Sequence, residues 1–129
     1  MFEVQAMASR DETGQCGLLG TKFLISAQDM ERAVAFYRDV IGLEVRVQSP
    51  WWSELSYGTS IVALHGGGSG EFRATGLSFT VRDINAACAA VVRGGGIVRS
   101  DPEDRGDEGI YLADLTDPEG NAFMMSQDK

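Results

Sequence analysis

The feature that most constrains the fold is an order of secondary structure that the sequence predicts twice. Residues 21–27 form a short apolar-centred strand, Asp29 stands at a helix N-cap, and three further strand-like runs follow. From residue 76 the same order returns, with Asp83 at the corresponding helix start, 54 residues later. The chain therefore predicts two modules of the form βαβββ, each a small sheet with a helix over one face.

Periodicity and turn residues give the expected bounds. A helical stripe follows each capping aspartate, and the triple glycine 94–96 ends the second helix. The charged stretch 101–108 is expected to be a solvated loop. Expected strands cover residues 21–27, 44–48, 53–57 and 60–65 in the first module, and 76–81, 97–100, 110–115 and 122–126 in the second.

The same reading predicts one domain. Residues 1–18 lack periodicity and are expected to form an N-terminal arm. Residues 19–127 are expected to hold both modules, about 19–66 and 73–127. The run Gly66-Gly67-Gly68-Ser69-Gly70 between the modules has the composition of a flexible linker.

Composition excludes several classes of protein. Hydrophobic residues are 43% and charged residues 23% of the 129, as in an ordinary folded domain. A net charge of −8 argues against a nucleic-acid partner, and no apolar run is long enough for a membrane span or a signal peptide. The two cysteines form no disulfide framework, which predicts a reducing, cytoplasmic location.

Two segments resemble a known family. The helix 29–43, with Phe36-Tyr37-Arg38-Asp39-Val40-Ile41-Gly42-Leu43 at its end, and the turn 117–121, Asp-Pro-Glu-Gly-Asn, are similar to the vicinal oxygen chelate superfamily. That superfamily includes glyoxalase I, bleomycin-resistance and fosfomycin-resistance proteins and extradiol dioxygenases. The resemblance implies an α+β fold in which two βαβββ modules form a cupped mixed sheet with the helices on its outer face. It also implies a homodimer.

The resemblance implies a metal centre at four positions, but their residues here are poor ligands. In metal-dependent members, His, Glu or Gln from the first and last strands of each module hold a divalent ion. The corresponding residues here are Lys22, Ala63, Gly76 and Met124, of which none is a usual ligand. No metal and no cofactor are therefore expected. The alternative keeps a metal held by His65, the only histidine, together with Glu54 and other donors.

The candidate cleft follows from alternation, because strand residues that point away from the helices line the uncovered face. His65 is the candidate catalytic group, and the adjacent tryptophans 51 and 52 are expected to point to opposite sides. Lys22 is expected to pair with Glu54 or to reach solvent at the rim. The candidate ligand-binding residues are Lys22, Leu24, Ser26, Trp51, Trp52, Glu54, Ala63, His65, Ser78, Thr80, Tyr111 and Met124.

Three functions fit these residues. The first is metal-independent binding of a small organic molecule in the cleft between the modules, and the acidic charge and the tryptophans favour a cationic or aromatic ligand. The second is a metal-dependent lyase or dioxygenase of the same superfamily. The third is a dimerisation scaffold without a ligand. Fold-level likeness does not decide among them.

Overall fold

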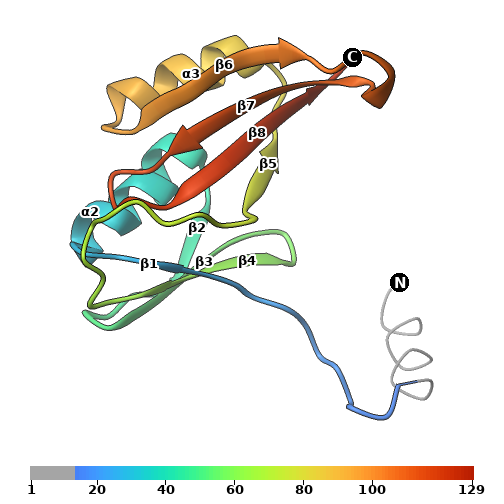
Figure 1. Cartoon of the computed structure of the whole chain (residues 1–129). Coiled ribbons are helices and arrows are strands. Elements are labelled where there is room, and N and C mark those ends of the chain that lie inside the picture. The colour runs from blue at the N-terminus through green and yellow to red at the C-terminus, as the bar shows by residue number, and fades with distance from the viewer. Residues whose placement is uncertain (1–13) are drawn as a thin grey trace.

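The computed structural model describes residues 14–129, and most of the expected N-terminal arm lies outside the described residues. The described part contains two four-stranded mixed sheets, and each has a helix over one of its faces (Figure 1). The predicted pair of βαβββ modules is confirmed.

The first module forms the sheet with strand order β1-β4-β3-β2, in which β1 runs parallel to β4. Asp29 caps the first helix by accepting a hydrogen bond from the Arg32 amide at 3.1 Å. The helix ends at Gly42, whose φ of +96° favours glycine. The elements are β1 (Phe23–Ser26), α2 (Met30–Ala35), the π-helical segment η1 (Phe36–Ile41), β2 (Glu44–Val47), β3 (Trp52–Tyr57) and β4 (Ser60–His65).

The second module repeats this plan with the order β5-β8-β7-β6, in which β5 runs parallel to β8. Asp83 caps its helix by accepting from the Ala86 amide at 3.1 Å. The elements are β5 (Ser78–Thr80), α3 (Ile84–Arg93), β6 (Ile97–Asp104), the 3-10 turn η2 (Gly106–Glu108), β7 (Ile110–Thr116) and β8 (Ala122–Asp128).

The expectation that residues 101–108 form a loop is wrong for its first half. Strand β6 continues to Asp104, and Glu103 and Asp104 lie opposite Leu112 and Tyr111 of β7. Because β6 is an edge strand, its charged side chains stay in water and Pro102 removes no hydrogen bond that a second neighbour needs.

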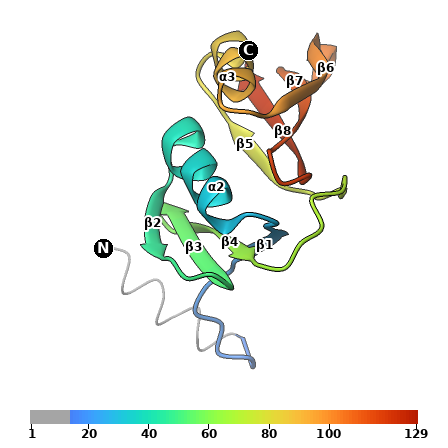
Figure 2. The ribbon, with the colours of Figure 1, turned by 90° about the vertical axis from the view of Figure 1, so that its left-hand side faces the viewer.

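The two modules share one hydrophobic core. Phe36 of η1 meets Phe123 of β8 edge to face at 6.2 Å between ring centroids, and Tyr37 lies 6.4 Å from Phe79 of β5. The buried residues of both modules form a single cluster. Figure 2 shows α2 lying between the first sheet and the second. The helix-covered face of each sheet is therefore turned toward the common core, and the other face, here called the open face, is turned away from it.

The turn 117–121 fastens the second module to the first. The buried Glu119 carboxylate accepts from the amides of Gln28 and Asp29 at 2.9 and 2.8 Å, and from Arg32 Nε at 2.6 Å. The start of α2 is thus held by a side chain from the other module.

Two further residues of this turn complete the connection. Asn121 accepts from the Ser26 amide at 3.1 Å and donates to the Ser26 carbonyl oxygen at 2.7 Å, as a neighbouring strand would. The Asp117 carboxylate accepts from the buried Tyr37 hydroxyl at 2.6 Å and from Asn121 Nδ2 at 2.9 Å. Burial raises the pKa of Asp117 despite these hydrogen bonds.

Candidate functional site

Strand register gathers seven of the candidate residues on the open face of the first sheet. Leu24, Ala63 and Glu54 lie side by side across β1, β4 and β3, because Ala63 is opposite both of the others. Ser26, His65 and Trp52 form the next row in the same way. Lys22 precedes β1 and joins this face through its contact with Glu54.

Four of these side chains, Lys22, Trp52, Glu54 and His65, form what we call the polar cluster. Glu54 Oε2 accepts from Trp52 Nε1 at 2.8 Å and lies 3.0 Å from Lys22 Nζ. The Lys22 ammonium is also 5.9 Å from the Trp52 ring centroid. The hydrogen bond from Trp52, followed by the contact with Lys22, lowers the pKa of Glu54 below its ordinary value. The carboxylate is therefore ionised and already has two donors.

His65 adds an acceptor to the polar cluster. Its ring meets Trp52 edge to face at 6.2 Å, and Nδ1 lies 2.7 Å from the Gly66 carbonyl oxygen. Because a carbonyl oxygen only accepts, Nδ1 carries the hydrogen, so Nε2 is the nitrogen that bears the lone pair whenever the ring is neutral. The exposed His65 side chain can thus receive a hydrogen bond from a bound molecule.

Lys22 also borders a groove between the modules. This inter-module groove has a volume of about 790 Å³ and runs along β1 and β5, where Ser78 and Thr80 line it with Lys22. Its remaining walls are mainly apolar and come from η1, β4, α3 and the residues in and next to β5. They include Val40, Ile41, Leu43, Leu77, Phe79, Val81, Ala87 and Ala90.

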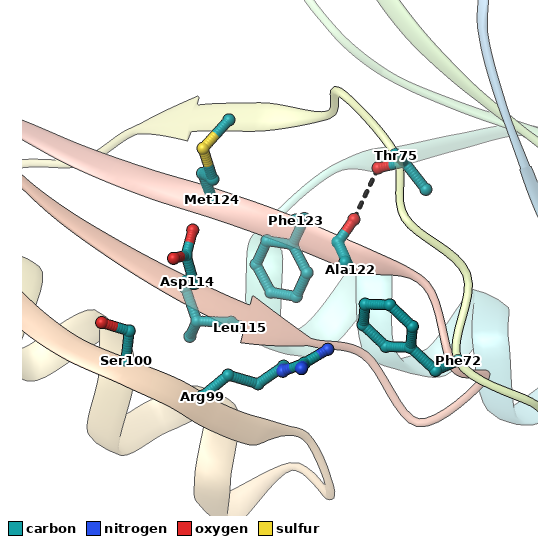
Figure 3. Close-up of a pocket in the computed structure, with 9 residues that line it drawn as sticks. All are labelled: Phe72, Thr75, Arg99, Ser100, Asp114, Leu115, Ala122, Phe123 and Met124. Atoms are coloured by element: carbon teal, nitrogen blue, oxygen red, sulfur yellow. Dashed lines mark hydrogen bonds between the residues drawn. The ribbon is translucent and has the colours of Figure 1, made fainter.

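The open face of the second sheet carries a separate hollow of about 330 Å³ (Figure 3). Here Met124 of β8 lies opposite Ser78 of β5 and Asp114 of β7, and Ser100 of β6 completes the row. Arg99 lines the same hollow, with its guanidinium 4.0 Å from the Phe72 ring centroid. We call this pocket the second-sheet hollow.

Sequence reasoning missed Arg99, Asp114 and Phe72. Asp114 could have been found, because it alternates with the buried residues 113 and 115. Arg99 could not have been found in this way, because the pairing register of β6 with β7 shifts between Val98 and Ser100. A β-bulge there gives β6 an extra residue, and strict alternation fails at a bulge.

Two of the candidate residues, Trp51 and Tyr111, lie in none of these strand rows and line neither the inter-module groove nor the second-sheet hollow. Trp51 is 68% exposed and precedes β3, whereas Trp52 is half-buried within the strand. Tyr111 packs against the hydrophobic core on the helix side of the second sheet, where the Lys129 ammonium lies 5.4 Å from its ring. Tyr111 therefore does not share a face with Ser78, Thr80 and Met124.

The residues at the positions where the family holds a metal do not fit a divalent ion. Lys22 places an ammonium there, Ala63 is a fully buried methyl, Gly76 has no side chain and Met124 is a thioether. Nowhere in residues 14–129 do three His, Cys, Asp or Glu side chains come together in a way that could hold a metal ion.

Comparison with known proteins places this fold in a family. The model of the Glyoxalase/Bleomycin resistance protein/Dioxygenase superfamily matches residues 21–125. No curated protein matches the chain. Within residues 14–129, no helix has the length and apolar character needed to cross a bilayer.

Solved structures share the fold at low sequence identity. A glyoxalase/bleomycin resistance protein/dioxygenase family enzyme from Burkholderia phytofirmans PsJN is 20% identical, with a TM-score of 0.72 over 84% of this chain and 97% of that one. TnmS3, an antibiotic binding protein from Streptomyces sp. CB03234, is 21% identical, with a TM-score of 0.63 over 86% and 98%. The fosfomycin resistance protein FosX from Listeria monocytogenes is 11% identical, with a TM-score of 0.71 over 87% and 95%.

The family model covers most of the chain, and its fold is the one that the two modules adopt. The protein belongs to the Glyoxalase/Bleomycin resistance protein/Dioxygenase superfamily.

Proposed function

We propose that the protein binds a small organic molecule without a metal, where the inter-module groove meets the polar cluster. The proposal rests on the Lys22–Glu54 ion pair, in which the Glu54 carboxylate also accepts a hydrogen bond from the Trp52 ring. These side chains occupy the face on which the family resemblance implies a metal, and they offer a cation, an anion and an aromatic surface in its place.

The chemistry of the walls supports an aromatic or cationic ligand. The half-buried Trp52 ring offers a flat surface for stacking, and Leu24 on the same sheet face is 55% exposed. The apolar groove would supply affinity, while Glu54 and the lone pair of His65 would orient hydrogen-bond donors of the ligand. An antibiotic binding protein and a fosfomycin resistance protein share the fold, which makes a sequestering role a reasonable version of this proposal.

We propose further that two copies of the chain form a homodimer. The open faces expose large apolar side chains to solvent, among them Leu24 and Phe72. Outside the inter-module groove, the two open faces of one chain turn away from its core, so a second copy is needed to cover their apolar side chains. Light scattering coupled to size exclusion should give twice the mass of one chain, and a monomer at micromolar concentration would contradict this part of the proposal.

The binding proposal is tested with bleomycin and a panel of planar aromatic amines. We expect at least one compound to raise the melting temperature of the protein and to quench its tryptophan fluorescence in a saturable way. Trp52→Leu should abolish both effects, whereas Trp51→Leu, which removes an exposed tryptophan next to it, should leave the melting-temperature shift in place. A panel without any stabilising compound, or equal effects of the two variants, would contradict the proposal.

A further inference from the structure

We propose that the second-sheet hollow is a second binding site, which takes a small carboxylic acid with a hydroxyl or amino group beside its carboxylate. This proposal rests on the second sheet and does not depend on binding at the polar cluster. Three observations support it: the placement of Arg99, the contacts of its guanidinium, and the presence of Asp114 in the same hollow.

A β-bulge directs Arg99 into the hollow. On β6, Val98 pairs with Leu115 and Ser100 with Asp114, so Arg99 is the extra residue between two consecutive pairs. Bulges often redirect a side chain at a functional site. The first module has the same device, because the register of β2 shifts between Val45 and Val47, around Arg46.

The two bulge arginines differ in their partners. Arg46 donates to the Ser56 hydroxyl at 3.4 Å. The guanidinium of Arg99 lies 4.0 Å from the Phe72 ring centroid, and in residues 14–129 it has no hydrogen bond and no ion pair. The contact with the face of the ring uses none of the guanidinium N–H groups, so they remain free to bind a carboxylate through two hydrogen bonds.

Asp114, in the same hollow, determines which kind of anion can bind to Arg99. Asp114 is exposed and lines the hollow with Arg99, and Figure 3 shows the Arg99 side chain extending toward Phe72 rather than toward the Asp114 carboxylate. A simple anion would be repelled by Asp114. A molecule whose carboxylate reaches Arg99 and whose adjacent O–H or N–H donates to Asp114 satisfies both groups.

The remaining walls leave room for a small apolar body. Phe72 and Met124 supply apolar surface, and the Thr75 hydroxyl is already engaged with the Ala122 carbonyl oxygen at 2.5 Å (Figure 3). A volume of about 330 Å³ lies at the small end of the range for ligand pockets, which suits a ligand with a single ring.

The test compares mandelate with phenylacetate, which differ only in the hydroxyl beside the carboxylate. Each is titrated into the ¹⁵N-labelled protein, and the dissociation constant is taken from the amide signals of Ser100 and Asp114. We expect saturable shifts with mandelate and binding about tenfold weaker with phenylacetate. Equal affinity for the two acids, or no saturable shift with mandelate, would overturn the proposal.

Two variants locate the site. Arg99→Gln should weaken mandelate binding about tenfold or more, whereas Arg93→Gln, which removes an exposed charge at the end of α3, should not change it. Asp114→Ala should abolish the preference for mandelate over phenylacetate. Equal effects of the two arginine variants would show that the net charge alone governs binding, and this would overturn the proposal.

These readouts are separate from those of the proposed function. The amide signals of Ser100 and Asp114 report on the second sheet, whereas Trp52 fluorescence reports on the first. A failure at one site is therefore distinguishable from a failure at the other.

Discussion

Three side chains of the turn 117–121 connect the two modules by hydrogen bonds, and this structural role explains why the turn resembles that of the family. Glu119 and Asn121 replace missing backbone partners at the start of α2 and beside β1, and Asp117 receives the buried Tyr37 hydroxyl. These side chains connect the modules and face the interior. A chain that keeps them keeps the fold, whatever its open faces bind, so the motif carries no information on the ligand.

Tyr37→Phe tests the buried contact with Asp117 through its dependence on pH. Because burial raises the pKa of Asp117, the stability that this carboxyl contributes is present in acid and is lost as the pH rises through that pKa. The Tyr37 hydroxyl favours the ionised form and offsets part of the loss.

The variant should therefore lower the free energy of unfolding by about 2 kcal/mol near neutral pH and by less in acid. Urea unfolding at several pH values measures this, with Tyr57→Phe on an exposed side chain as the control. An equal loss at all pH values would show that the hydroxyl does not act through an ionised Asp117.

Glu119→Gln tests the connection between the turn and α2. An amide keeps one oxygen for the amides of Gln28 and Asp29, but it turns an NH₂ group toward the Arg32 guanidinium and removes the ion pair. We expect a loss of about 2 kcal/mol in the free energy of unfolding. The matched variant Glu31→Gln, on the exposed side of the same helix, should cost less than about 0.5 kcal/mol. A loss no greater than that of Glu31→Gln would contradict the structural role of Glu119.

The alternation of side chains along a strand determined which site residues could be placed from the sequence. Alternation put Leu24, Glu54 and His65 on one face, and the unfavourable burial of an unpaired lysine made contact with Glu54 one of the alternatives for Lys22, beside exposure at the rim. The hydrogen bond from Trp52 to Glu54 has no signature in the sequence, because it requires two neighbouring rows of the same strand and one side-chain conformation.

At the scale of elements, capping and turn residues predicted where helices and strands begin and end, but they did not predict the irregular segments. Both helices begin after their capping aspartates, and β4 has the predicted bounds, 60–65. The helix of the first module changes to π-helical turns at Phe36, and no residue pattern marks that change. The bulges of β2 and β6 were likewise invisible, since one extra residue reverses the alternation.

Gly120 shows how closely the turn approaches the linker, and Gly42 gives a matched control. Both have a positive φ, +94° and +96°. A Cβ at Gly120 would lie 2.6 Å from the Gly70 carbonyl oxygen, whereas a Cβ at Gly42 would meet nothing within 4 Å. Gly42→Ala should cost about 1 kcal/mol of backbone strain, and Gly120→Ala about 2 kcal/mol more, because the linker must move. Thermal unfolding of the two variants measures the difference. Equal costs would show that backbone strain alone explains both.

At the scale of the whole molecule, the duplication builds two open faces with different chemistry on one core. The first sheet carries an ion pair beside a tryptophan, and the second carries an arginine against a phenylalanine ring, with an acid in the same hollow. The duplicated plan could be predicted from the sequence. The directions of the two open faces could not be predicted, because they depend on how η1 packs against the second sheet through Phe36 and Phe123.

The central claim is that the first open face binds its ligand without a divalent ion, and a metal titration of the EDTA-treated protein tests it most directly. We expect Mn²⁺, Ni²⁺ and Zn²⁺, added singly, to leave the melting temperature unchanged, because Lys22, Ala63, Gly76 and Met124 supply no suitable donor set. A saturable rise in melting temperature with any of the three ions, lost in both His65→Ala and Glu54→Gln, would contradict the claim.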